Sequence, residues 1–219
     1  METKGFKRVA CIQKKQIDFN ISSQLFIRKK SFDTLCTQLH KPFNDQIESV
    51  KKALNHGIQN EGVAIEKYKF IMNYRLHRST KTKQVGLIIQ SQIFWLGASP
   101  DGVILDKNNQ EIGLLEIKCP YSKRNSSVTD MVNDKSFYIA LDKDKKPYLK
   151  KDHQYGYFTQ IQVAMGLARL EWCHFVVYVY EGIVIIKVEF DKGYFNSVIE
   201  KMNKFYKDYY LDHLLHKST

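Results

Sequence analysis

The stretch SPDGVILDKNNQEIGLLEIKCPY, residues 99–121, contains two apolar segments separated by a polar turn. The segments at 102–106 and 111–118 are short and are joined by the turn DKNNQ, so the sequence predicts a β-hairpin here. In a hairpin, the residues that precede the first strand lie close to the end of the second strand. The charged residues at those two places are therefore expected to come together.

Three charged side chains belong to that end of the predicted hairpin. Because side chains alternate between the two faces of a strand, Glu116 and Lys118 project to the same side. Pro100 favours an extended conformation of the residue before it, and Gly102 allows a sharp exit. These constraints hold Asp101 at the strand edge, where the hairpin returns it to Glu116.

This arrangement has two interpretations. The first is an ordinary exposed ion pair between Glu116 and Lys118. The second is a metal site, because two carboxylates at one point repel each other unless a divalent cation lies between them. Mg²⁺ prefers hard oxygen ligands and retains several waters, which suits phosphate substrates. Lys118 would then stabilise charge that develops at phosphorus or orient the attacking water. The position of Asp101 favours the metal site.

The composition is that of a basic globular protein. The 219 residues are enough for one domain, so we expect a single domain over 1–219, with 1–16 as a flexible basic segment. The net charge of +11 favours a polyanionic partner such as nucleic acid, although a solvated lysine-rich surface also accounts for it. No apolar run approaches the about 20 residues of a membrane helix.

The cysteines and the N-terminus indicate a cellular setting. The four cysteines are scattered without a CxxC pair, which argues against a cysteine-based zinc site. The start of the chain lacks the apolar core of a secretory signal, so we expect an intracellular protein, in the nucleus or the cytoplasm depending on the host. His153 and His174 each lack a second histidine at helical spacing, so neither is favoured as a metal ligand.

The remaining sequence predicts an α/β fold with a central mixed sheet flanked by helices. Residues 122–152 are polar and predict a mobile loop with a short edge strand, and Glu181-Gly182 predicts a turn. Residues 17–27 give only a weak apolar–polar pattern. The predicted helices are 45–73, 154–170 and 191–213, the last with Phe195, Ile199, Met202, Phe205, Tyr206 and Tyr209 inward; the other predicted strands are 85–90, 93–97, 173–180 and 183–190.

The first predicted helix carries a carboxylate within its apolar stripe. Glu61 falls on the stripe, whereas Glu66 falls off it and is expected to be solvated. A carboxylate in an apolar stripe is costly unless it is paired or near a cation. Glu61 therefore needs a partner, which is either a lysine or water at the stripe edge, or a metal site. The stripe consists of Val50, Leu54, Ile58, Ile65, Tyr68 and Met72.

The second predicted helix carries two glutamines, and the sequence does not separate their roles decisively. Gln160 shares a face with Tyr157, Ala164 and Leu167, which favours it as the buried amide. Either Gln160 or Gln162 could instead be a core amide bonded to the backbone.

Taken in order, these residues resemble the lambda-type exonucleases and YqaJ-like viral recombinases, within the PD-(D/E)xK nucleases. The resemblance covers roughly residues 17–213. The motifs that carry it are FNISSQLF (19–26), similar to a degraded Thr-Ala-Ser segment; HGIQNEGVAIEKY (56–68), similar to a Gly-x-x-x-Glu-x-x-Ala helix; FWLGASPDGV (94–103); LLEIKCPY (114–121); and HQYGYFTQIQVAMGLAR (153–169), similar to a Tyr-x-x-Gln-x-Gln helix.

The resemblance implies a restriction-endonuclease-like core and metal-dependent hydrolysis of DNA, with Mg²⁺ as the metal and Mn²⁺ as a substitute. The residues that it assigns are Asp101 as the bridging carboxylate, Glu116 as the second ligand, the Ile117 carbonyl as a backbone ligand, Glu61 as the helical carboxylate that reaches the metal through water, Lys118 as the catalytic lysine and Gln160 as the helix glutamine.

The segment CIQKKQIDFNISS, residues 11–23, departs from the family pattern. It has no Trp and no Arg, so the arginine that should hold a terminal 5′ phosphate is not identifiable. Arg28 is the nearby candidate because its planar fork bonds phosphate bidentately, with Ser23 as a hydroxyl donor; the alternative is an ordinary surface charge. The other expected DNA contacts are Lys123, Arg124 and Tyr157.

The sequence therefore predicts a Mg²⁺-dependent DNA nuclease, most simply an exonuclease acting on duplex ends. The resemblance implies 5′→3′ polarity, a role in recombination and repair, a ring-shaped homo-oligomer and a single-strand annealing protein as partner. Two alternatives stay open: a structure-specific or nicking endonuclease on the same fold, and a non-catalytic nucleic-acid-binding module derived from a nuclease.

Overall fold

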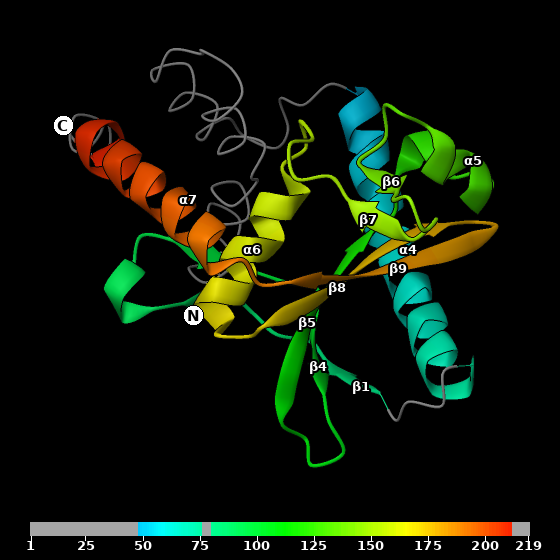
Figure 1. Cartoon of the computed structure of the whole chain (residues 1–219), viewed down its shortest axis with the longest axis horizontal. Coiled ribbons are helices and arrows are strands. Elements are labelled where there is room, and N and C mark those ends of the chain that lie inside the picture. Colours follow the sequence, from blue (N-terminus) through cyan, green and yellow to red (C-terminus); the bar gives the residue numbers. More distant parts are fainter. Residues whose placement is uncertain (1–47, 76–79, 212–219) are drawn as a thin grey trace, which may run out of the picture.

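A mixed five-stranded sheet forms the centre of the fold, in a computed structural model that describes residues 48–75 and 80–211 (Figure 1). The parallel pair β5–β8 is flanked by antiparallel neighbours, so β5 has a partner strand on each side. This sheet confirms the predicted fold class. Its strands, in spatial order, are β1 (Lys81–Lys83), β4 (Gly102–Leu105), β5 (Glu111–Lys118), β8 (Trp172–Val179) and β9 (Gly182–Glu189).

Helices cover both faces of this sheet (Figure 1). Helix α4 (Glu48–Phe70), which continues as a π-turn, packs on one face, and α6 (Tyr157–Ala168) and α7 (Lys192–Phe205) pack on the other. No helix in the described ranges is long and apolar enough to cross a membrane. The smaller elements are β2 (Ile88–Ile89), β3 (Gly97–Ala98), α5 (Val128–Asn133), β6 (Ile139–Leu141) and β7 (Pro147–Leu149).

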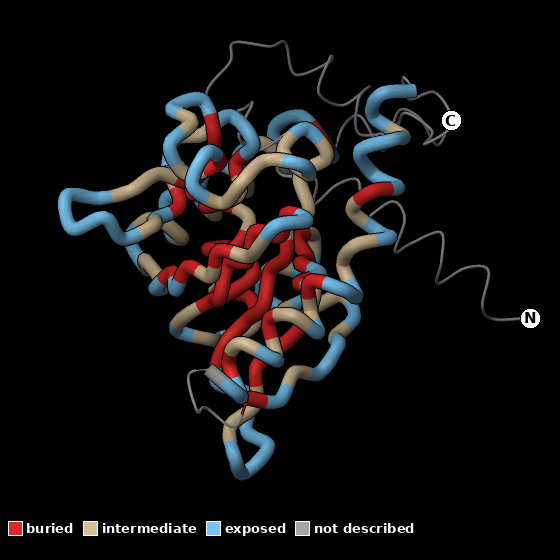
Figure 2. The backbone as a smooth tube through the Cα atoms, turned by 90° about the vertical axis from the view of Figure 1, so that its right-hand side faces the viewer, coloured by how far each residue is buried: buried red, intermediate tan, exposed pale blue. Residues whose placement is uncertain are grey.

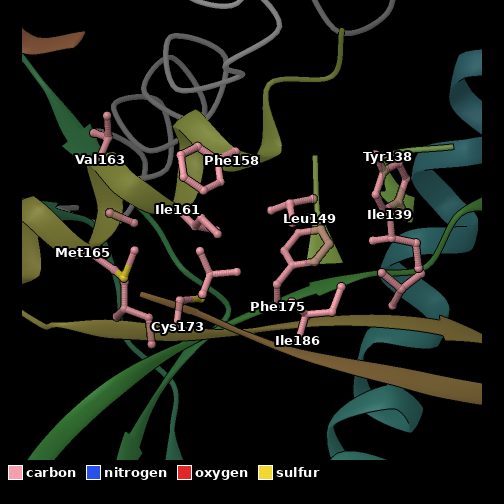
Figure 3. Close-up of a cluster of buried hydrophobic side chains, with 14 of the residues drawn as sticks. Tyr138, Ile139, Leu149, Phe158, Ile161, Val163, Met165, Cys173, Phe175 and Ile186 are labelled. Carbon is pink, nitrogen blue, oxygen red and sulfur yellow. The ribbon is translucent and has the colours of Figure 1, made fainter. Parts of the chain in front are cut away.

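The alternation of side chains along β5 separates two hydrophobic clusters. Leu114 faces the larger cluster, which lies between the sheet and α6 (Figure 3). Leu115 and Ile117 face the smaller cluster, where they pack with Ala64 and Tyr68 of α4. Buried residues follow the central strands, whereas the tip of the β4–β5 hairpin is exposed (Figure 2). The central strand is therefore fixed from both faces.

The prediction of a mobile loop over residues 122–152 was wrong. This segment contains α5 and the β6–β7 hairpin, and its apolar side chains belong to the larger cluster. Met131, Tyr138 and Ile139 are almost completely buried there. They stand among lysines and aspartates in the sequence, so no periodic pattern reveals them.

Several element boundaries differ from the sequence prediction. The predicted strands 85–90 and 93–97 contract to the short pair β2–β3, with a 3₁₀ turn at Ser91–Ile93 between them. The edge strand β1 was not predicted. Val179 pairs with Gly182, so the two-residue turn before β9 is Tyr180-Glu181, one position earlier than expected.

The inward face of α7 is only partly as predicted. Phe195, Ile199 and Met202 pack against the larger cluster, but Tyr209 is exposed and Tyr210 is buried instead. The helix continues as a π-helical segment at Tyr206–Tyr210. The change in helical period alters which of its last side chains face inward. The segments 1–16 and 17–27 lie outside the described residues.

Candidate active site

The start of β4, the end of β5 and the first half of α6 converge at one point. The β4–β5 register pairs Gly102 with Leu115, which places Asp101 beside the end of β5. The Ile117 backbone N–H donates to Asp101 Oδ2 at 2.6 Å. Glu116 Oε1 accepts hydrogen bonds from Lys118 Nζ at 2.6 Å and from Gln160 Nε2 at 2.7 Å. The structure thus brings a second element, α6, to the charged end of the hairpin.

Burial destabilises the charged form of the Glu116 carboxyl group. Glu116 is 3% exposed. Its burial, and next the negative charge of Asp101, raise the pKa of Glu116 from 4.5 to about 7, against the opposing effect of Lys118. Burial alone would lower the pKa of Lys118, but the adjacent Glu116 carboxylate raises that pKa above its ordinary value. The lysine stays charged, and the two carboxylates together carry more negative charge than it balances.

The stability of the metal-free protein should record this repulsion. A carboxyl whose folded pKa is raised contributes stability below its ordinary pKa, and that contribution is lost as the pH rises toward about 7. Asp101→Asn keeps an oxygen that accepts from Ile117 but removes the charge. In chelator, Asp101→Asn is therefore expected to become more stable relative to the parent as the pH rises from 4.5 to about 8. The measure is the melting temperature of the variant minus that of the parent at each pH. The exposed Asp152→Asn is the control, and a difference that does not change with pH would contradict the repulsion.

Helix α4 brings a third carboxylate toward the same strand end. Glu61 is half-buried. Burial, and then the negative charges of Glu61 and Asp101, raise the pKa of the Cys119 thiol to about 12, so both carboxylates act on the residue that follows Lys118. Glu66 is exposed, as predicted, and pairs with Lys69 at 2.9 Å.

A buried hydrogen bond holds α4 against the sheet. The Tyr68 hydroxyl and His174 Nδ1 are 2.7 Å apart, and the Trp172 ring packs on the imidazole of His174. The other histidine considered from the sequence, His153, lies 3.0 Å from the Ser136 carbonyl oxygen through its Nε2. Both histidines therefore make structural contacts, which explains their presence without a metal.

The two glutamines of α6 have different surroundings. Gln160 contacts Glu116, whereas Gln162 is fully buried, where its amide donates to the Glu189 carbonyl and accepts from Asp191 N–H. The expectation that Gln160 is the buried amide was wrong, because Gln162 takes that place. The sequence could not separate them, since α6 is buried on nearly all sides and lacks a solvent face that would mark its register.

The donor set suits a hard divalent cation with few protein ligands. Across residues 48–75 and 80–211, no three His, Cys, Asp or Glu side chains gather closely enough to hold a metal ion. Asp101 and Glu116 converge at the end of β5, and Glu61 approaches the same strand end from α4. In a strand, the N–H and C=O of one residue point to the same side, so the Ile117 carbonyl faces Asp101. Mg²⁺ is compatible with this set because it retains several waters.

The described residues that were expected to contact DNA also contact other side chains of the protein. Lys123 Nζ lies 2.6 Å from Asp134 Oδ2, and this hydrogen bond holds the pKa of Asp134 below its ordinary value. The Arg124 guanidinium lies 4.0 Å from the Tyr121 ring centroid. Lys118 Nζ lies 4.8 Å from the Tyr157 ring centroid, so this aromatic residue borders the site directly. Ser23 and Arg28 lie outside the described residues.

Comparison with known proteins agrees with this geometry. A family model described as the YqaJ-like viral recombinase domain matches residues 9–171. An alkaline exonuclease (LHK-Exo) from Laribacter hongkongensis has the same fold, with a TM-score of 0.58 and 19% identity over 93% of each chain. A crystal structure of LHK-Exo in complex with dAMP gives the same TM-score and identity over 91% of this chain and 93% of that one. No curated protein sequence matches. The resemblance inferred from the motifs is thus confirmed, and the chain belongs to the family of YqaJ-like viral recombinase domains.

Proposed function

We propose that this protein is a metal-dependent DNA nuclease that degrades duplex DNA from its ends. The observation that carries the proposal is the buried Glu116 carboxylate, which Lys118 and Gln160 hold against the Asp101 side of the hairpin. An acidic pair beside a lysine, with Glu116 buried and Asp101 partly buried, is poorly explained as an ordinary surface ion pair in a member of this family.

The residues divide the chemistry among them. Asp101, Glu116 and the Ile117 carbonyl would hold the metal, which would be Mg²⁺ or, as a substitute, Mn²⁺. When bound, the metal supplies Lewis acidity to the phosphate and lowers the pKa of a water. Lys118 stabilises negative charge on the phosphate oxygens and orients the attacking water. Gln160 fixes the Glu116 oxygen that faces Lys118.

The remaining residues position the substrate. Glu61, on the α4 side, would position a water for the metal when that is bound. Lys123, Arg124 and Tyr157 contact the DNA, in keeping with the net charge of +11. Arg28 and Ser23, which lie outside the described residues, are the residues proposed to bind a terminal 5′ phosphate. The family also suggests 5′→3′ polarity, a ring-shaped homo-oligomer and a single-strand annealing partner in recombination and repair.

Action at ends rests on the relatives. The similar solved protein is described as an alkaline exonuclease, and its complex contains dAMP, a nucleoside monophosphate of the kind that an exonuclease releases. Identity to that protein is 19%, so it supports the choice of exonuclease only together with the family match.

Digestion of linear and closed circular DNA tests this function. End-labelled linear duplexes should release mononucleotides in Mg²⁺ and remain intact in chelator, with faster release from 5′-phosphorylated ends than from 5′-hydroxyl ends. Covalently closed circles should survive. Nicking of the circles would indicate an endonuclease, and DNA binding without any cleavage would indicate a non-catalytic module.

A further inference from the structure

A cavity of about 250 Å³ opens beside Asp101, between α4 and the β1 edge of the sheet. Pockets that enclose a whole small-molecule ligand are larger, at about 300–1,000 Å³. This cavity therefore fits a fragment of a longer molecule better than a free cofactor. Its lining comes from Gly62, Ile65, Glu66 and Lys69 of α4, Thr82, Lys83 and Gln84 at β1, Asp101 and Gly102 before and in β4, and Leu115 of β5.

The cavity wall on α4 contains a glycine inside a helix. Glycine destabilises a helix interior relative to alanine, so its use there requires a reason. Packing among the described residues does not provide one, since a Cβ at Gly62 would meet none of their atoms within 4 Å. Gly62 borders the cavity directly, next to Glu61 in the sequence. A missing side chain at this place lets the backbone of another molecule approach α4 closely.

Two lysines line the cavity, and both pair with exposed carboxylates. Lys83 Nζ lies 3.4 Å from Glu111 Oε1, with the two side chains 62% and 47% exposed. Lys69 pairs with Glu66, whose side chain is 73% exposed. Exposed ion pairs contribute little stability, so both ammonium groups can turn to a stronger anion such as phosphate.

We propose that this cavity is a backbone subsite, which holds the sugar and phosphate next to the phosphodiester that is cut. Lys83 and Lys69 bind that neighbouring phosphate, and Gly62 leaves room for the sugar. Asp101 closes the far end and connects the subsite to the metal-binding carboxylates. The subsite rests on the proposed nuclease function, because its position has meaning only if the strand is cut at Asp101 and Glu116.

Substitution of Gly62 tests whether the open space beside α4 is needed to bind DNA. Gly62→Leu should fill the cavity, weakening the binding of a fluorescent 3′-overhang duplex in chelator and slowing cleavage in Mg²⁺, each by about tenfold. Gly57→Leu is the matched control, because Gly57 also lies in α4, a Cβ there would meet no described atom within 4 Å, and Gly57 does not line the cavity. Its binding and cleavage should stay within about twofold of the parent. Both variants should melt at or above the parent temperature, because both remove a helix glycine.

Substitution of Lys83 tests whether a positive charge at the cavity binds a DNA phosphate. This test does not depend on whether Gly62→Leu folds. Lys83→Ala should weaken binding and lower the slope of log affinity against log salt by about 0.7–0.9, the contribution of one phosphate contact. Lys81→Ala is the matched control, since Lys81 is exposed on the same edge strand but pairs with Asn109 and does not line the cavity. Its salt slope should equal that of the parent.

The outcomes separate the two proposals. If the parent cleaves DNA but Gly62→Leu matches Gly57→Leu and Lys83→Ala matches Lys81→Ala, the subsite is wrong and the nuclease stands. If the parent binds DNA without cleaving it, the nuclease is wrong and the subsite falls with it. If the parent neither binds nor cleaves DNA, both are overturned.

Discussion

Asp101→Asn and Glu116→Gln should each lower the rate of DNA cleavage in Mg²⁺ by about three orders of magnitude. Each substitution removes one of the two acidic side chains that converge at the end of β5, and neutral amides bind Mg²⁺ poorly. Both variants nearly preserve shape. In Asp101→Asn, the amide oxygen would still accept from the Ile117 N–H, which donates to Asp101 at 2.6 Å.

Single-turnover cleavage of an end-labelled duplex measures this loss, and circular dichroism verifies the fold. Glu189→Gln is the control, because the Glu189 side chain is exposed and pairs with Lys187. Alanine is a poorer test at Asp101, since it would leave the Ile117 N–H without its acceptor. A rate close to that of the parent for Asp101→Asn would rule out the proposed site.

Glu61→Gln should slow cleavage by about a hundredfold, whereas Glu66→Gln should be nearly silent. The two glutamates lie on the same helix, α4, so the two substitutions perturb that helix equally. Glu61 is half-buried and acts electrostatically on Cys119 together with Asp101. Glu66 is exposed and bonded to Lys69.

Kinetics over a range of Mg²⁺ concentrations distinguish the role of Glu61. If Glu61 orients a water on the metal, Glu61→Gln should lower the maximal rate at saturating Mg²⁺ as well as the apparent affinity for the ion. If Glu66→Gln lost DNA cleavage while Glu61→Gln retained it, the α4 carboxylate would have been assigned to the wrong position.

The β4–β5 hairpin was the most predictable part of the fold. Its strands have short apolar segments, its turn is polar, and strand alternation alone places Glu116 and Lys118 on one face. The contact of Gln160 with Glu116 depends instead on how α6 packs, and the helix is apolar on most sides. The sequence therefore indicated a charged strand end but not the surroundings of Glu116.

The α4 stripe shows why helical periodicity has limits. Tyr68 and Met72 are buried as predicted, but Val50, Leu54 and Ile58 are exposed. The apolar contacts of α4 with the sheet come from its second half, through Ala64 and Tyr68, whereas in the first half only His56 is buried among the described residues, against Tyr121 and Tyr180. Periodicity gives the direction of a face but not the extent of the surface that packs against it.

The strand β1 was missed for a different reason. It has only three residues, Lys-Thr-Lys, which carry no apolar signal. Lysine is common on edge strands because its charge discourages pairing with other chains. The cavity beside Asp101 depends on this strand, so no argument from apolar patterns could have found the subsite.

The double pairing of β5 has a consequence for amide hydrogen exchange. The backbone around Glu116 is enclosed between two neighbouring strands and covered by helices on both faces. Amides in such a strand exchange only when the whole domain opens, whereas those of an edge strand such as β1 exchange through local fraying. The Glu116 backbone amide thus belongs to the slowest-exchanging part of the molecule, and that of Lys83 to a faster one. Local openings at the β1 edge are therefore expected to leave the backbone of Glu116 and Lys118 in place.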